Sequence, residues 1–176
     1  MADSSVFNLD GSGVSVSWFD NGQPSSAGRF SAGRSMNGKW QFFHKNGKVS
    51  SVEIYEKGKL LSNQYFDEEG NPMPEAVIID KQASFTGGLE GWKKFIAKQL
   101  YFPSPYKIVN ADKAIVVVEG VVDEDGKMTD VEVFNPFDPA FDKIAVNALR
   151  RSPKWTPAVN HNRKVKYKIR QVVTFS

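Results

Sequence analysis

An aromatic residue followed three or four positions later by glycine recurs through the first half of this 176-residue chain. Successive aromatics of the series lie 11 to 13 positions apart. That period fits one strand plus one turn and is too short for a helical hairpin. The series predicts antiparallel hairpins over residues 14–70, with its aromatics in the core. Its members are Phe19 with Gly22, Phe30 with Gly33, Phe43 with Gly47, Tyr55 with Gly58, and Phe66 with Gly70.

Two Asn-Gly pairs, at residues 21–22 and 46–47, predict the tightest reversals of this region. Asn-Gly favours type I′ turns, which need positive φ at both central residues. Together with Gly38-Lys39-Trp40 leading into Phe43, these pairs make residues 14–75 resemble the MORN-type repeats of bacterial proteins. Such repeats stack hairpins into a curved sheet, and the repeat alone does not identify a ligand.

The aromatic-glycine repeat ends at Asn71-Pro72-Met73-Pro74-Glu75, where two prolines disfavour regular strand pairing. Beyond this point helical and strand patterns alternate. We therefore expect a hairpin-repeat region over residues 1–75 and a second domain over residues 76–176.

Two amphipathic helices are predicted in the second domain. The first extends from Leu89 to Leu100, with Thr86 as its cap and Pro103 beyond its end. The second begins at Asp138-Pro139, a capping residue followed by a first-turn proline, and ends before Pro153. Its apolar face comprises Phe141, Ile144, Ala145, Ala148 and Leu149.

Three strands are predicted beside these helices. A β-branched run over 114–122 and an alternating run over 128–134 indicate a hairpin. The final strand, over 164–175, alternates between an apolar and a basic face, which predicts one buried side. The apolar residues are Val165, Tyr167, Ile169, Val173 and Phe175, and the basic ones are Lys164, Lys166, Lys168 and Arg170.

The order helix, hairpin, helix, strand predicts two helices packed on one face of a small antiparallel sheet. The whole chain is therefore expected to be α+β, with an N-terminal antiparallel hairpin sheet followed by this smaller layered domain. Trp155, between Pro153 and Pro157 in a short connection, is expected to be a structural residue.

Several kinds of chemistry are not supported by the residues present. The chain has no cysteine, which excludes disulfides and zinc-thiolate sites. His44 and His161 belong to no triad-like pattern and are expected at the surface. The Asp123-Glu124-Asp125 run fails the EF-hand spacing and is expected to form a hairpin turn. We expect no catalytic residue, metal or cofactor. We also expect no nucleic-acid binding, because the basic face of the last strand carries no aromatic platform for bases.

No apolar run approaches the roughly 18 residues needed to cross a bilayer, and the first residues lack the basic and apolar blocks of a signal peptide. From this pattern alone, either the protein is cytoplasmic or a native leader or anchor is absent from this chain.

Four short motifs, in this order, resemble the TonB C-terminal domain family. Each motif alone is unspecific, whereas all four in the family's order over about 93 residues are distinctive. They are Ser84-Phe85-Thr86-Gly87-Gly88, Leu100-Tyr101-Phe102-Pro103, Val121-Val122-Asp123-Glu124-Asp125-Gly126 and Pro153-Lys154-Trp155-Thr156-Pro157-Ala158. The family usually has an Asn-Gly turn where this chain has Asn160-His161-Asn162-Arg163, and full transducers also carry a membrane helix and a proline-rich arm.

The resemblance implies a periplasmic protein that binds the TonB-box peptide of outer-membrane receptors by strand addition, in TonB-dependent transport. Inner-membrane proton-channel proteins would be further partners, through an N-terminal segment not present in this chain, and a homodimer is an additional option. The alternative is an envelope-associated scaffold without transducer activity. The implied peptide-binding residues are Tyr101, Phe102, Pro103, Lys166, Tyr167, Lys168, Ile169, Arg170 and Gln171.

Overall fold

The computed structural model describes the chain except for residues 1, 75–79, 105 and 108–111. The chain forms two compact units. The first unit comprises Met1–Asp80 and Val159–Lys164, and the second comprises Lys81–Ala158 and Val165–Ser176. Antiparallel sheets and two helices among the described residues confirm the α+β class. Glu75, the last residue of the expected boundary, lies outside the described residues.

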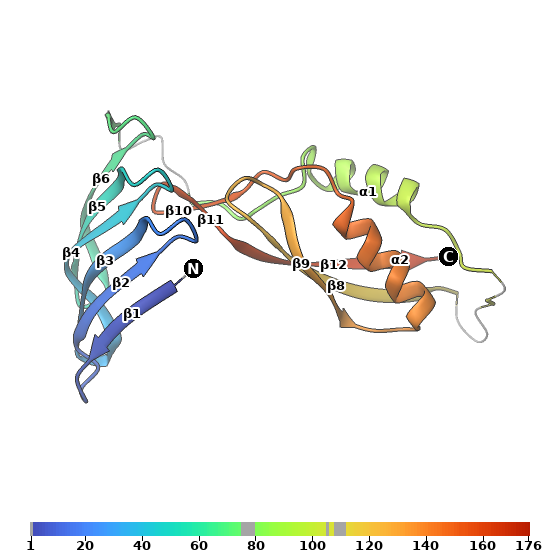
Figure 1. Cartoon of the computed structure of the whole chain (residues 1–176), viewed down its shortest axis with the longest axis horizontal. Helices are drawn as coiled ribbons and strands as arrows, with labels where there is room; N and C mark the ends of the chain where they lie inside the picture. The colour runs from blue at the N-terminus through green and yellow to red at the C-terminus, as the bar shows by residue number, and fades with distance from the viewer. Residues whose placement is uncertain (1, 75–79, 105, 108–111) are drawn as a thin grey trace. The chain divides into compact units, whose positions relative to one another are not determined.

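The first unit contains a sheet of seven antiparallel strands, which follow one another in sequence order within the described residues (Figure 1). This arrangement confirms the hairpins predicted over residues 14–70. Pro72 and Met73 still pair with the preceding strand, although the two prolines were expected to disfavour pairing. The strands are β1 (Ala2–Phe7), β2 (Gly13–Trp18), β3 (Pro24–Ser31), β4 (Ser35–Phe43), β5 (Val49–Glu56), β6 (Lys59–Phe66) and β7 (Pro72–Met73), with the 3-10 helix η1 (Ala32–Arg34) between β3 and β4.

The turns at both Asn-Gly pairs are tight, but they are not type I′. Gly22 and Gly47 have φ of 81° and 86°, whereas Asn21 and Asn46 are not among the residues with positive φ. Each glycine N–H donates to the carbonyl three residues earlier, which is the type I turn with a glycine bulge that three-residue hairpin loops adopt. A two-residue turn with positive φ at both centres occurs instead at Lys57-Gly58.

The buried face of the first sheet combines aromatic and polar side chains. Ring contacts link Phe7 to Phe30, Phe30 to Trp40 and Trp40 to Phe42. Only one of the five aromatics expected in the core, Phe19, is buried, and the other four are half-buried. On β4 the buried aromatics are Trp40 and Phe42, whose positions alternate with that of Phe43. Buried polar residues share this face: Ser17, Ser25, Ser26, Ser50, Ser51 and Glu53.

The second unit packs two helices on a three-stranded antiparallel sheet with the order β12-β8-β9 (Figure 1). Asp138 caps the second helix by accepting a hydrogen bond from the Ala140 N–H, and the five predicted apolar residues of this helix are all buried. Both helices and the hairpin are therefore confirmed. The elements are α1 (Gly88–Gln99), β8 (Ala114–Val122), β9 (Met128–Asn135), α2 (Pro139–Arg150) and β12 (Tyr167–Phe175).

Two local expectations for the second half are wrong. The residue that caps α1 is Gly87, with φ of 86°, and the hydroxyl of Thr86 instead donates to the Lys154 carbonyl at 2.6 Å. The last strand is also interrupted at Lys166, because the chain there changes its pairing partner. Residues before Lys166 form β11 (Arg163–Val165), which pairs with β10 (Ala158–Asn160), and residues after it form β12, which pairs with β8.

No helix in the described part of the chain is both long and apolar enough to cross a membrane.

Candidate functional site

Strand β12 lies at the edge of its sheet. It pairs with β8 along its whole length, from Tyr167 opposite Val122 to Phe175 opposite Ala114. Among the residues that the structure describes, no strand pairs with its other side. In an antiparallel pair, alternate residues direct both backbone N–H and C=O away from the partner strand. β12 therefore presents a row of backbone donors and acceptors at an open edge, as strand addition requires.

The side chains of β12 alternate as the sequence predicts. Ile169, Val173 and Phe175 are buried in the core below the helices, and Gln171 is half-buried on the same side. Lys168 and Arg170 are exposed on the opposite side. Of the predicted site residues, Tyr167 to Gln171 lie on the edge strand, while Lys166 immediately precedes it.

The basic residues of β12 are paired with a carboxylate on the neighbouring strand. Lys168 Nζ lies 2.7 Å and Arg170 Nε 3.0 Å from the Glu119 carboxylate, whose side chain is 7% exposed. Hydrogen bonds from Lys168, and then from Arg170, lower the pKa of Glu119 to about 2. The Arg170 guanidinium also lies over the Phe134 ring, 3.5 Å from its centroid. These cations therefore stabilise the outer face of the sheet.

One hollow lies where α1 ends and β12 ends. We call it the Phe175 hollow; it has a volume of about 300 Å³. It brings the predicted residues Tyr101 and Phe102 together with the end of β12, whereas Pro103 is buried and is not among its lining residues. Tyr101 is 67% exposed, so its ring is available to a ligand. The lining residues are Ile96, Ala97, Leu100, Tyr101, Phe102, Thr174, Phe175 and Ser176.

A second hollow, which we call the Gln171 hollow, lies at the N-terminal end of α1 and has a volume of about 220 Å³. Sequence reasoning assigned only Gln171 of its residues to the site. Its walls include residues of the first TonB-like motif and of α1, together with Trp155. Trp155 is 5% exposed and donates from Nε1 to the Ser152 hydroxyl, as expected of a structural residue. The lining residues are Ala83, Ser84, Phe85, Gly88, Leu89, Trp92, Trp155 and Gln171.

A polar cluster in the first unit involves both histidines, and neither is fully exposed as expected. His44 is 7% exposed and its Nε2 lies 2.9 Å from the Phe66 carbonyl oxygen. His161 stacks on Phe42 with ring centroids 3.7 Å apart, and its Nδ1 lies 2.9 Å from the Glu53 carboxylate. The expectation failed because the sequence pattern shows which residues alternate along a strand. It does not show which distant residues they contact in the fold.

Glu53 is the centre of this cluster, with only 1% of its side chain exposed. Burial favours its neutral form, but hydrogen bonds from His161, Tyr55 and Ser51 outweigh burial and lower the pKa of Glu53. Burial and the adjacent carboxylate raise the pKa of the Tyr55 hydroxyl well above its usual range. The Glu53 carboxylate is therefore a satisfied structural anion.

His161 and Asn162 occupy the centre of the β10–β11 turn, with φ of 52° and 57°. The His161 N–H donates to Asp80 at 2.9 Å and its carbonyl accepts from the Ser50 hydroxyl at 3.0 Å. The Asn162 amide donates to the Phe66 carbonyl at 2.7 Å. This turn, residues 159–164, is thus anchored in the first unit, although the chain on either side of it belongs to the second.

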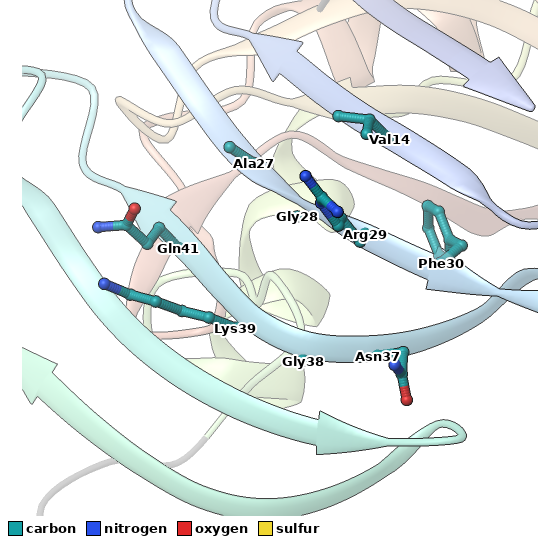
Figure 2. Close-up of a pocket in the computed structure, with 9 residues that line it drawn as sticks. All are labelled: Val14, Ala27, Gly28, Arg29, Phe30, Asn37, Gly38, Lys39 and Gln41. Carbon is teal, nitrogen blue, oxygen red and sulfur yellow. The ribbon is translucent and has the colours of Figure 1, made fainter.

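A further hollow of about 480 Å³ opens in the first sheet between β3 and β4 (Figure 2). The pairing of these strands is irregular between Ala27 and Arg29, which separates them locally. Arg29 and Lys39 are exposed at its rim. Across the described ranges, no group of three or more His, Asp or Glu side chains is arranged to hold a metal ion.

Fold and edge together define a small α+β module with two helices on one face of an antiparallel sheet and an open terminal strand. Residues 109–176 match the family described as Gram-negative bacterial TonB protein C-terminal, a family of binding and energy-transduction domains that are not enzymes. The matched range contains β8, β9, α2 and β12, and it begins after α1. No match was found among curated proteins or among solved structures.

Proposed function

We propose that this protein binds an extended peptide by strand addition to the free edge of β12. The observation that carries the proposal is the open edge of β12, which lies in the range matching the TonB family. We further propose that the peptide is the TonB box of outer-membrane receptors and that binding takes place in the periplasm as part of TonB-dependent transport.

The edge strand supports this proposal through backbone chemistry. Backbone hydrogen bonds supply affinity in strand addition, and pockets for alternate side chains supply selectivity. β12 is nine residues long, which suffices to pair with a short peptide. It is also held in place by a core that includes Ile169, Val173 and Phe175. A strand that is already ordered loses little conformational entropy of its own on binding.

The test is a titration of the whole 176-residue chain with synthetic TonB-box peptides, followed by amide NMR and hydrogen exchange. We expect chemical-shift changes concentrated at Tyr167–Phe175. Every second amide of β12, those not donating to β8, should exchange fast in the free chain and slowly in the complex. Absence of these changes at millimolar peptide would contradict the proposal.

Backbone-methylated peptides provide the matched control. In one peptide the methylated amides are those that would donate to β12, and in the other they are the alternate amides that would face solvent. Binding should be lost for the first peptide and retained for the second. Equal loss for both peptides would show that side chains, and not strand pairing, hold the peptide.

The scaffold alternative gives a different result in the same experiment. A dimer formed through β12 would slow the alternate amides without any peptide, and the slowing would depend on protein concentration. Sedimentation of the free chain separates this outcome from peptide binding.

A further inference from the structure

Both hollows are lined by residues of α1 and by residues in the C-terminal half of β12 or just after it. Leu89 and Trp92 of α1 line the hollow that contains Gln171, and Ile96 and Ala97 line the hollow that contains Phe175. α1 and β12 therefore run in the same direction, as Figure 1 also shows.

The distance between the two hollows can be estimated along β12 and, independently, along α1. Gln171 and Phe175 are four strand residues apart, which corresponds to about 13 Å. Leu89 and Ala97 are eight helical residues apart, which corresponds to about 12 Å. The two estimates agree, so the hollows are separated by four residues of any strand laid alongside β12. Residues i and i+4 of a strand point to the same face.

The lining of both hollows selects apolar side chains. Most lining residues are aliphatic or aromatic, and Leu89 and Tyr101 are each 67% exposed in the free chain. A bound side chain would bury these surfaces, and burial of apolar area is the main source of binding energy at such sites. At about 220 and 300 Å³, the open hollows exceed an enclosed cavity of about 150 Å³ that binds benzene.

We propose that the bound peptide places apolar side chains four residues apart into the Gln171 hollow and the Phe175 hollow. This inference rests on the proposed strand addition and specifies its sequence preference. The partner is therefore an extended segment whose residues i and i+4 are apolar and whose intervening residues contribute mainly backbone hydrogen bonds.

The test uses ten-residue, terminally blocked peptides of serine, threonine and glutamine that carry two leucines. The leucines stand at i and i+4, at i and i+3, or at i and i+2, so composition is constant. We expect the i and i+4 peptide to bind the whole chain at least about tenfold more tightly than either other peptide, because only its two leucines are both buried.

Two matched variants of α1 test whether the Phe175 hollow sets this preference. Ala97 is exposed and lines the Phe175 hollow, so Ala97→Phe should occupy that hollow and abolish the preference for i and i+4. Lys98→Phe adds the same ring to the next exposed position of α1, which is not among the residues lining the hollow, and should leave the preference unchanged. Circular dichroism of both variants checks that they fold as the wild type does.

The outcomes separate this inference from the proposed function. If all three peptides bind equally and shift the β12 amides, strand addition stands and the subsite inference is overturned. If none of these peptides shifts the β12 amide signals while TonB-box peptides do, strand addition again stands and only the subsite inference is overturned. If no peptide of either kind does so, both proposals fail.

Discussion

The two units bury different kinds of surface. The second unit has an apolar core in which Val116, Val118, Phe141 and Leu149 are at most 2% exposed. The first unit buries a face rich in hydroxyl groups together with the Glu53 carboxylate. Apolar packing carries no titratable group and responds to changes in volume, whereas buried polar groups destabilise the fold when they lose a partner. The stability of the first unit should therefore depend on individual hydrogen bonds, and that of the second on filled volume.

Trp155→Ala should produce the largest effect and tests the second half of this comparison. Trp155 packs against Phe85 with ring centroids 5.2 Å apart and is 5% exposed. Removal of a buried indole leaves a cavity and should cost about 3–5 kcal/mol of unfolding free energy. Urea denaturation followed by circular dichroism measures it. A cost below about 1 kcal/mol would mean that the core tolerates the loss and that volume is not what stabilises this unit.

Glu53→Ala should cost about 3 kcal/mol in the first unit, because the groups that donate to Glu53 become unsatisfied in a buried place. The matched control is Glu53→Gln, which keeps the shape and one acceptor and should cost about 1–2 kcal/mol. Hydrogen exchange of the β4 and β5 amides measures both. Equal costs for the two variants would show that the effect comes from packing and not from hydrogen bonding.

His161→Asn isolates the anchored turn. Asparagine tolerates the left-handed conformation of this position, so the turn geometry is retained. The stack on Phe42 and the bond to Glu53 are lost, for a cost of about 1–2 kcal/mol. We expect faster exchange of amides in residues 159–164, while the amides of α2 keep their protection. Unchanged exchange in the turn would contradict its anchoring by His161.

Acid should weaken the first unit through Glu53. The folded-state pKa of Glu53 is lowered below its ordinary value near 4.3, so in that range the unfolded chain binds the proton more readily. The stabilisation is complete above about pH 4.3 and is lost as pH falls through the lowered pKa. Melting midpoints of the wild type and Glu53→Gln between pH 6 and 3 should converge, since the variant lacks this group. Parallel curves would assign the acid effect to other carboxylates.

Gly47→Val should have the smallest effect, about 1 kcal/mol or more. Gly47 has φ of 86°, and an added Cβ would also lie 2.6 Å from the Gln23 side-chain oxygen. A β-branched residue resists this conformation. The matched control is Lys45→Val in the same turn, at a position outside the positive-φ region. If both variants melt at the wild-type temperature, the turn is not held in this conformation.

Sequence reasoning succeeded where local pattern determines structure. The hairpins over 14–70, the Asp138 cap and the alternation of Ile169 and Val173 all follow from turn residues and periodicity. These features depend on neighbours in sequence, which a single chain displays directly. The position of the candidate site on the last strand came instead from the family resemblance, and that strand lies at the sheet edge among the described residues.

It failed where structure depends on distant partners. Nothing local to His161 or Ser50 reveals that the two meet across more than a hundred residues of sequence. Polar residues such as Ser25 are expected at the surface unless their partner is known. The walls of the Gln171 hollow were missed for the same reason, since Leu89 and Gln171 come together only through the packing of α1 beside β12.

The anchored turn at 159–164 has a consequence for biosynthesis. The ribosome completes Met1–Asp80, and with it the face that receives the turn, well before it makes residue 159. At 5–20 residues per second the interval is about 4–16 s. During that time Phe42 and Glu53 lack the His161 imidazole that later contacts them. The first unit can therefore complete its folding only after residues 159–164 have been synthesised, although most of it is made first. A chain truncated before residue 159 should leave this face uncovered and should bind chaperones.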